Sequence, residues 1–167
     1  MNAKKWISTL NLERHPEGGY YRELYHSDVW LDDESTRLRY GGERRSATSI
    51  YFLLESGDVS RFHRLKSDEI WYFHSGTALT VHVIAPDGTY SKHPLGLGLS
   101  NGEEPQICIP RNHIFGATVN ATTPDDYAFV SCMVSPGFDF ADFELFEQDD
   151  LLRQYPQHSE IIRRLTK

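Results

Sequence analysis

The sequence is poor in cysteine and in basic charge. Its 167 residues include two cysteines, Cys108 and Cys132, which are too few for a disulfide scaffold. Both lie in apolar, strand-like runs, so we expect small core residues in a reducing compartment. Lys and Arg number 17 against 24 Asp and Glu, which gives a net charge of −7. This acidic balance argues against nucleic acid and against anionic membranes as partners.

The sequence also lacks long apolar runs. The longest run covers residues 50–54, whereas a helix needs about 20 apolar residues to cross a bilayer. Lys4 and Lys5 are followed only by the short apolar segment 6–10, which does not form the core of a secretory signal. We therefore expect a soluble, cytoplasmic protein with no membrane partner.

Short strand-like runs fill the middle of the chain. Turn residues separate them, for example Pro86-Asp87-Gly88. The runs cover residues 47–54, 59–65, 69–75, 78–85, 89–95, 105–109, 113–119 and 127–135. Many short strands without intervening helices predict an antiparallel barrel or sandwich. Aromatic residues make up 13% of the chain, which favours a barrel with a lined interior.

The flanking segments have a different character. Residues 6–10 predict a short helix, residues 20–26 a strand, and residues 28–42 an exposed loop. After the last strand come acidic residues interleaved with phenylalanines, which we interpret as a solvated face over an aromatic stripe that packs on the barrel. Two short helices broken at Pro156 follow.

One domain is predicted over residues 1–167. Its barrel core covers about 46–135, with an N-terminal extension at 1–45 and a C-terminal segment at 136–167.

The strongest chemical signal is a histidine and a glutamate on adjacent strand-like runs. Strand alternation places Leu65 on the same face as His63. A tight connection would then bring Glu69 back beside His63, with Trp71 on the face of Glu69. An imidazole beside a carboxyl group in an apolar pocket can act as a general base or supply two metal ligands. The alternative is a satisfied core pair that closes a hairpin.

Other side chains are candidates to contact a ligand in the same interior. An aromatic wall would suit a flat or sugar-like ligand, although ordinary core packing accounts for aromatic residues equally well. Arg22 suits a carboxylate or phosphate, unless it pairs with Glu23 or with an acid of the C-terminal segment. The candidate ligand-binding residues are Arg22, Trp71, Gln106, His113, Phe115 and Phe138.

The spacing of the histidine and the glutamate resembles the first motif of the cupin superfamily, G-x5-H-x-H-x3,4-E-x6-G. Gly57, His63, Glu69 and Gly76 fall on its positions, while Leu65 occupies the second histidine position.

The second cupin motif matches only at Pro110, and Phe115 stands where its ligand histidine would be. Two of the usual four metal ligands therefore remain, and His113 has the parity to add a third. A zinc or iron site needs at least three well-placed ligands, so we expect no metal and no other cofactor.

Four further segments resemble the signatures of the cupin-5 family, which are small cupins of unassigned function. They lie at residues 15–23, 49–54, 68–71 and 136–144, and the resemblance spans roughly residues 8–147. It implies an all-β fold, a double-stranded β-helix of the jelly-roll type, with short N- and C-terminal helices. It also implies a homodimer, but it supplies no activity.

Two functions fit these features. The chain resembles sugar-nucleotide epimerase cupins, in which a histidine base works with an acidic partner and a tyrosine acid. By that resemblance, His63 would take the proton, Glu69 would stabilise the imidazolium, and Tyr51 or Tyr21 would return a proton in a metal-independent isomerase or epimerase. The other function is a metabolite-binding module without catalysis. A metal-dependent enzyme is the weakest alternative.

Overall fold

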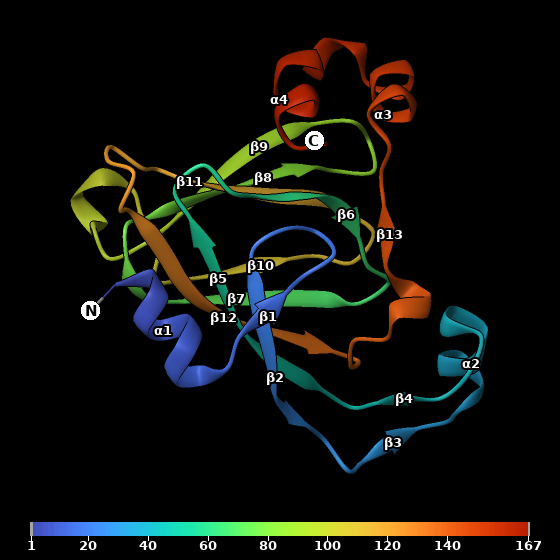
Figure 1. Ribbon diagram of the computed structural model, residues 1–167. Helices are drawn as coiled ribbons and strands as arrows, with labels where there is room; N and C mark the ends of the chain where they lie inside the picture. The colour runs from blue at the N-terminus through green and yellow to red at the C-terminus, as the bar shows by residue number, and fades with distance from the viewer. Residues whose placement is uncertain (1, 167) are drawn as a thin grey trace.

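Two antiparallel sheets face each other across a common apolar core, in a computed structural model that describes residues 2–166 (Figure 1). The first sheet has the order β1-β2-β5-β12-β7-β10. Its strands are β1 (Glu13–Arg14), β2 (Tyr20–His26), β5 (Thr48–Glu55), β12 (Tyr127–Ser135), β7 (Asp68–Gly76) and β10 (Gln106–Ile109).

The second sheet has the order β13-β6-β11-β8-β9. Its strands are β13 (Glu144–Leu145), β6 (Val59–Arg64), β11 (Ile114–Val119), β8 (Leu79–Ile84) and β9 (Tyr90–Leu95). A separate hairpin-like pair, β3 (Trp30–Leu31) and β4 (Arg44–Arg45), extends away from both sheets (Figure 1). This is the all-β, two-sheet jelly-roll arrangement that the strand pattern and the family resemblance predicted.

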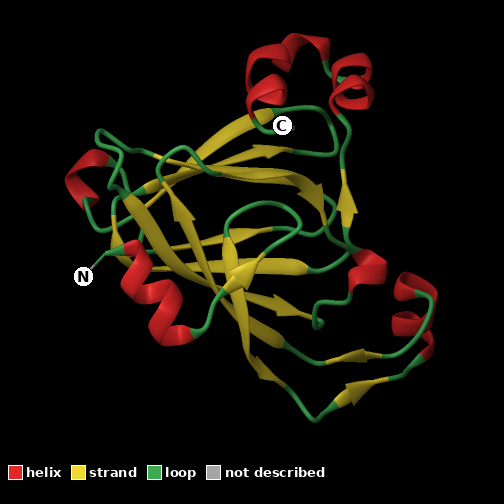
Figure 2. Ribbon diagram, viewed as in Figure 1, coloured by secondary structure: helices red, strands yellow, loops and turns green. Residues whose placement is uncertain are grey.

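Short helices lie around the two sheets (Figure 2). They are α1 (Ala3–Leu10), α2 (Glu34–Tyr40), α3 (Gln148–Gln154) and α4 (Ser159–Arg164), with 3-10 turns η1 (Leu99–Asn101), η2 (Phe140–Asp142) and η3 (Pro156–His158). Helix α1 lies beside the first sheet, α3 and α4 lie over the second, and α2 lies beside the β3–β4 pair (Figure 1). Helix α1 packs Trp6 on Phe129 of the first sheet, with ring centroids 4.4 Å apart. Helices α3 and α4 bury Leu151 and Ile162 against the second sheet. None of the helices between residues 2 and 166 is long and apolar enough to cross a membrane.

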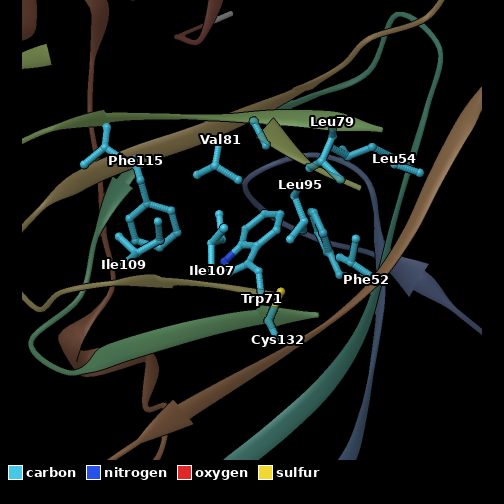
Figure 3. Packing of buried hydrophobic residues seen from close by; sticks show 14 of the residues in the cluster. Phe52, Leu54, Trp71, Leu79, Val81, Leu95, Ile107, Ile109, Phe115 and Cys132 are labelled. Carbon is cyan, nitrogen blue, oxygen red and sulfur yellow. The ribbon is translucent and has the colours of Figure 1, made fainter. Parts of the chain in front are cut away.

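The main core lies between the sheets and is built from alternate residues of their strands (Figure 3). Phe52 and Leu54 of β5 point inward together with Trp71 of β7, and they meet Val81 of β8 from the second sheet. Each of the eight strand-like runs predicted for the middle of the chain overlaps an observed strand, β5 to β12. The alternation of side chains therefore fixes which residues can face the interior.

Residues 28–42 do not form the exposed loop that the sequence suggested, because they contain β3 and α2. Asp33 caps α2 by accepting hydrogen bonds from the backbone N–H and the hydroxyl of Thr36, at 3.1 and 2.7 Å. The helix is held to the barrel at its other end, where the buried Tyr40 hydroxyl lies 2.9 Å from Ser67 Oγ.

Two other expectations require correction. Cys132 is buried in the core, but Cys108 is exposed because it alternates with the inward-facing Ile107 and Ile109 on β10. Asp142 is not on a solvated acidic face. Its carboxylate accepts two hydrogen bonds of 2.8 Å from the guanidinium of Arg44, and both side chains are buried. This bidentate pair ties η2 to the β3–α2–β4 segment.

Candidate functional site

One end of the barrel contains a cavity of about 220 Å³. Its walls come from the ends of β6 and β12, the beginnings of β5 and β7, the β1–β2 region, and the phenylalanine-rich segment after β12. The lining residues are Glu13, His15, Glu17, Tyr21, Arg22, Glu23, Thr48, Ile50, His63, Leu65, Glu69, Cys132, Val134, Phe138 and Phe140. Buried titratable groups in a concave apolar setting make this the candidate site.

A buried carboxyl group links two histidines in the cavity. Glu17 Oε2 lies 3.0 Å from His63 Nε2 and 3.7 Å from His15 Nδ1. The other carboxyl oxygen, Oε1, accepts a hydrogen bond of 2.8 Å from the hydroxyl of Ser60. The side chains of His15, Glu17 and His63 are all more than nine-tenths buried. The partner of His63 is thus Glu17, and not Glu69 as the motif spacing suggested.

The hydrogen bonds determine where the protons of this pair lie. His63 Nδ1 is 2.7 Å from the carbonyl oxygen of Arg61, which can only accept, so Nδ1 carries a hydrogen. The contact between Nε2 and Glu17 therefore requires one shared proton. Burial lowers the pKa of His63 to about 4 and raises the pKa of Glu17. Both shifts favour a neutral pair, in which the carboxylic acid of Glu17 donates to Nε2.

The turn between β1 and β2 places Glu17 inside the barrel. Its backbone N–H donates to His15 Nδ1 at 3.1 Å, and its carbonyl accepts from the backbone N–H of Arg61 at 2.7 Å. Gly18 has a φ of 107°, and a Cβ at this position would lie 2.1 Å from the carbonyl oxygen of Val59. Only glycine therefore allows the turn to approach β6 this closely.

Glu69 lines the cavity as a separate acid. It is 7% exposed, and its pKa is raised to about 8, chiefly by burial. The Cys132 thiol and the Trp71 indole lie beside the carboxyl group and partly oppose this shift of its pKa. Neither contact has normal hydrogen-bond geometry, and Trp71 Nε1 is a buried donor without a partner among residues 2–166. The carboxyl group of Glu69 is therefore buried, faces the cavity and can form hydrogen bonds with a molecule bound there.

Two more of the residues expected to bind a ligand lie at the cavity. Arg22 is at its rim and donates a hydrogen bond of 2.9 Å to the carbonyl of Leu10, so it pairs with neither Glu23 nor an acid of the C-terminal segment. Phe138 forms part of the wall and packs edge-to-face on Phe140, with centroids 4.9 Å apart. The structure therefore brings Arg22 and Phe138 together with His63 and Glu69.

Three expected site residues lie elsewhere. Tyr51 packs on Phe129 on the outer face of the first sheet, with centroids 5.6 Å apart, because its neighbours on β5 point inward. Gln106 is exposed on β10. His113 turns toward the carbonyl of Arg111, 3.1 Å from Nδ1, at a half-buried position before β11. None of these three side chains shares the cavity with His63.

Trp71 and Phe115 belong to the core beneath the cavity and do not line it. Both are almost fully buried (Figure 3). The ring of Phe115 lies 4.2 Å from that of His63, centroid to centroid, and therefore supports the imidazole from behind.

Sequence reasoning missed the roles of His15 and Glu17, although both belong to the turn at residues 15–19. Tyr21, expected only as a substitute for Tyr51, does line the cavity and packs edge-to-face on His15 at 4.6 Å. The signal available in the sequence was the position of these two polar residues in a turn, directly before Gly18 and Gly19.

The residues at this end of the barrel do not fit the usual cupin metal centre. Leu65 presents an apolar side chain to the cavity at one ligand position, and Phe115 occupies another. His63 uses both ring nitrogens for contacts within the protein. Over the part of the chain that the structure describes, no group of three or more His, Cys, Asp and Glu side chains is placed to hold a metal ion.

Comparison with known proteins agrees with this architecture. An uncharacterized protein of Saccharomyces cerevisiae, YML079W, is 28% identical over 159 residues, which is 91% of this chain and 79% of that protein. The crystal structure of protein SO0799 from Shewanella oneidensis has a TM-score of 0.89 at 47% identity, covering 100% of this chain and 98% of that one. A hypothetical protein from Leishmania major has a TM-score of 0.91 at 40% identity, covering 99% of both chains.

The profile of the cupin-5 family, described as "Cupin superfamily (DUF985)", matches residues 4–146. This match covers most of the chain, and the barrel has the strand arrangement expected of a cupin. The chain therefore belongs to the cupin-5 (DUF985) family of the cupin superfamily.

Proposed function

We propose that the cavity binds a small organic molecule and exchanges a proton with it, as in an isomerase or epimerase that works without a metal. The observation that carries this proposal is the buried Glu69 carboxyl group, which faces the cavity beside the Glu17–His63 pair. An acid enclosed in an apolar wall, with a second acid–base pair next to it, is the arrangement that proton-transfer enzymes use.

Glu69 is the group that exchanges the proton in this proposal. Its pKa of about 8 lies close to neutral pH, so the carboxyl group can both donate and accept a proton. No other side chain from residue 2 to residue 166 holds it in a hydrogen bond of normal geometry. A bound ligand can therefore approach its oxygens directly.

His63 acts as a positioning residue. Its Nδ1 is bonded to the carbonyl of Arg61 and its Nε2 to Glu17, so neither nitrogen is free to reach a ligand. The imidazole keeps the proton of Glu17 in a hydrogen bond, which prevents two bare carboxylates from facing each other when Glu69 ionises. The base role thus passes from His63, where the motif placed it, to Glu69.

Tyr21 is the candidate for the second proton donor. It lines the cavity, and its ring packs on that of His15. The backbone N–H of Glu17 donates to His15 Nδ1, so the hydrogen of the neutral ring lies on Nε2. Tyr21 and His15 therefore offer a hydroxyl and an N–H donor to a molecule in the cavity.

The competing function is a binding module that holds a metabolite unchanged. The observation in its favour is that both ring nitrogens of His63 already bond to groups of the protein. The imidazole is therefore fixed and unable to reach a ligand. In this case Glu69 would only orient the ligand. Both functions require a small molecule near Glu69 and differ in whether a proton moves.

A deuterium-exchange experiment separates them. Untagged protein is purified, and co-purifying compounds are identified by mass spectrometry and then incubated with fresh enzyme in D₂O. We expect the wild type to introduce deuterium into the compound, and we expect Glu69→Gln to bind it but to exchange at least about 100-fold more slowly. Glu160→Gln, which makes the same substitution at an exposed position on α4, is the control. Retention without any exchange by the wild type would leave the binding module as the function.

We also propose that the protein is a homodimer. Leu24, Tyr25, Val29 and Trp30 are large apolar residues that are about half exposed around the C-terminal part of β2, and β1 pairs only with the beginning of that strand. Contact with a second copy would cover this surface. Size-exclusion chromatography with light scattering is expected to give twice the chain mass, and a monomer at micromolar concentration would contradict the proposal.

A further inference from the structure

The acids of the cavity point to the class of molecule that it binds. We propose that the ligand is a small organic cation, in the simplest case a primary ammonium compound, whose charged nitrogen pairs with Glu69. This inference rests on the proposed small-molecule function, and it names the chemical class of the ligand.

The charged side chains of the lining are mostly acidic. Four glutamates face the cavity or its rim, namely Glu13, Glu17, Glu23 and Glu69. Within the described range 2–166, Arg22 is the one lysine or arginine of the lining, and it is exposed at the rim with a bond to the Leu10 carbonyl. An anionic ligand would therefore meet several carboxyl groups and at most one cationic side chain to pair with. A cationic ligand would find several carboxyl groups to pair with and at most one side chain of its own charge.

The rim continues this acidic character. Glu13 forms no ion pair with any described residue, and the neighbouring Arg14 is directed away toward Asp58, at 3.3 Å, and over the ring of Tyr20. Glu23 pairs with His26 at 2.7 Å, but both are about half exposed and screened by water. A ligand entering the cavity therefore passes carboxylates before it reaches the interior.

The walls between rim and interior are aromatic. Tyr21, Phe138 and Phe140 line the cavity, and Phe140 is 53% exposed at its mouth. The faces of such rings attract ammonium groups by cation–π interaction. Aromatic faces together with carboxyl groups form a recognition site for organic cations, and apolar residues such as Ile50 and Val134 accommodate the carbon skeleton.

Glu69 supplies the specific contact at depth. It is nine-tenths buried, lines the cavity, and has no hydrogen bond of normal geometry among residues 2–166. Glu17, in contrast, is already occupied by Ser60 and His63. An ammonium nitrogen beside Glu69 forms an ion pair with its carboxylate, and the proton that leaves the carboxylic acid passes to the solvent. Binding is thus coupled to proton release.

Three probes of the same shape and different charge test the proposal: benzylamine, benzyl alcohol and benzoate. Their binding to the full-length protein is measured by isothermal titration calorimetry at pH 7, where the amine is protonated. We expect benzylamine to bind at least about tenfold more tightly than benzyl alcohol, and we expect no measurable binding of benzoate. Titrations in buffers of different ionisation enthalpy should show release of up to one proton with benzylamine.

Two variants assign the effect to one carboxyl group. Glu69→Gln should remove the preference for benzylamine and its proton release while leaving benzyl alcohol within about twofold. Glu160→Gln, with the same substitution at an exposed position on α4, should behave like the wild type.

Benzoate binding as tightly as benzylamine, an amine preference that survives in Glu69→Gln, or no binding of any probe at millimolar concentration would overturn the cation proposal. Equal binding of benzylamine and benzyl alcohol would overturn it too, but would leave a small-molecule site. The D₂O exchange experiment then still decides the proposed function independently.

Discussion

Two buried histidines of the second sheet have nearly equal acidity and very different surroundings. His63 on β6 and His82 on β8 both pair with β11, opposite Phe115 and Gly116 respectively. Burial lowers the pKa of each to about 4. His63 faces the cavity between the sheets, whereas His82 lies on the outer side, next to Tyr90 and the C-terminal helices.

Their hydrogen-bond partners explain the contrast. His82 Nδ1 lies 2.7 Å from the hydroxyl of Tyr90, and its Nε2 lies 2.9 Å from Thr118 Oγ1. Hydroxyls can donate or accept, so this ring is satisfied as a neutral group in either tautomer. His63 faces a carbonyl, which can only accept, and a carboxyl group, with which it must share one proton. A lowered pKa therefore does not distinguish a site from a structural histidine, but the partners and the cavity do.

The loss of stability in acid should show how similar the two histidines are. In the unfolded chain each ring takes up a proton near pH 6.5, but in the folded protein only near pH 4. The unfolded state thus binds more protons in this window, and each ring reduces the free energy of unfolding by up to about 3 kcal/mol as the pH falls from 6.5 to 4. Urea unfolding of His63→Gln and His82→Gln should show a smaller loss than the wild type, and an unchanged loss in either variant would break the comparison.

Alkaline stability should separate the two regions, because only the His63 region contains a buried acid. Glu69 ionises near pH 4.5 when unfolded and near pH 8 when folded, so unfolding releases a proton and stability falls as the pH rises through this window. We expect Glu69→Gln to be more stable than the wild type by about 2–4 kcal/mol at pH 8.5 and to differ little at pH 5. A variant that is less stable at both pH values would show that Glu69 is an ordinary core residue.

Removal of one partner should affect the two histidines unequally. Thr118→Val leaves His82 Nε2 buried without a partner, and we expect a loss of about 1–2 kcal/mol in the free energy of unfolding. Glu17→Gln replaces a donating carboxylic acid by a donating amide, so the neutral contact to His63 persists and the loss should stay below about 1 kcal/mol. Chemical denaturation at pH 7 measures both, and the reverse order would show that Glu17 is ionised.

The position of the ring hydrogen is a further property of the two histidines, and it can be measured without unfolding the protein. His63 should be fixed as the Nδ1–H form at pH 7 by the carbonyl of Arg61. The ¹⁵N shifts of its ring distinguish a protonated Nδ1 from an unprotonated Nε2. A charged imidazolium at pH 7 would contradict the neutral Glu17–His63 pair, and His82→Gln provides the assignment control.

The sequence was informative about the strands and much less so about the site. Alternation and turn residues located the strands from β5 to β12, since these signals are local. Alternation could not determine the inner face of β5, because Phe52 and Leu53 are both fully buried. Phe52 contacts the barrel core, and Leu53 contacts the cluster under α1. The sequence pattern therefore did not show that Tyr51 points away from the interior, and Tyr51 was a reasonable candidate for the proton donor.

The pairing of His63 is the clearest case of a contact that local pattern could not predict. Glu69 is close in sequence and lies on the correct face, but the turn at residues 15–19 enters the barrel end and brings Glu17 closer. That approach depends on backbone hydrogen bonds between the turn and β6 and on the space left at Gly18. Strand periodicity cannot predict such tertiary contacts.

The buried pair between Arg44 and Asp142 gives a remote part of the chain control over the entrance of the cavity. Asp142 ends the short η2 turn that begins at Phe140, and Phe140 stands at the mouth. A shift of the β3–α2–β4 segment would consequently reposition an entrance ring while the buried acids stay in place. If the proposed function is correct, substitutions in residues 30–45 would change the size of ligand admitted without altering Glu69 or the Glu17–His63 pair.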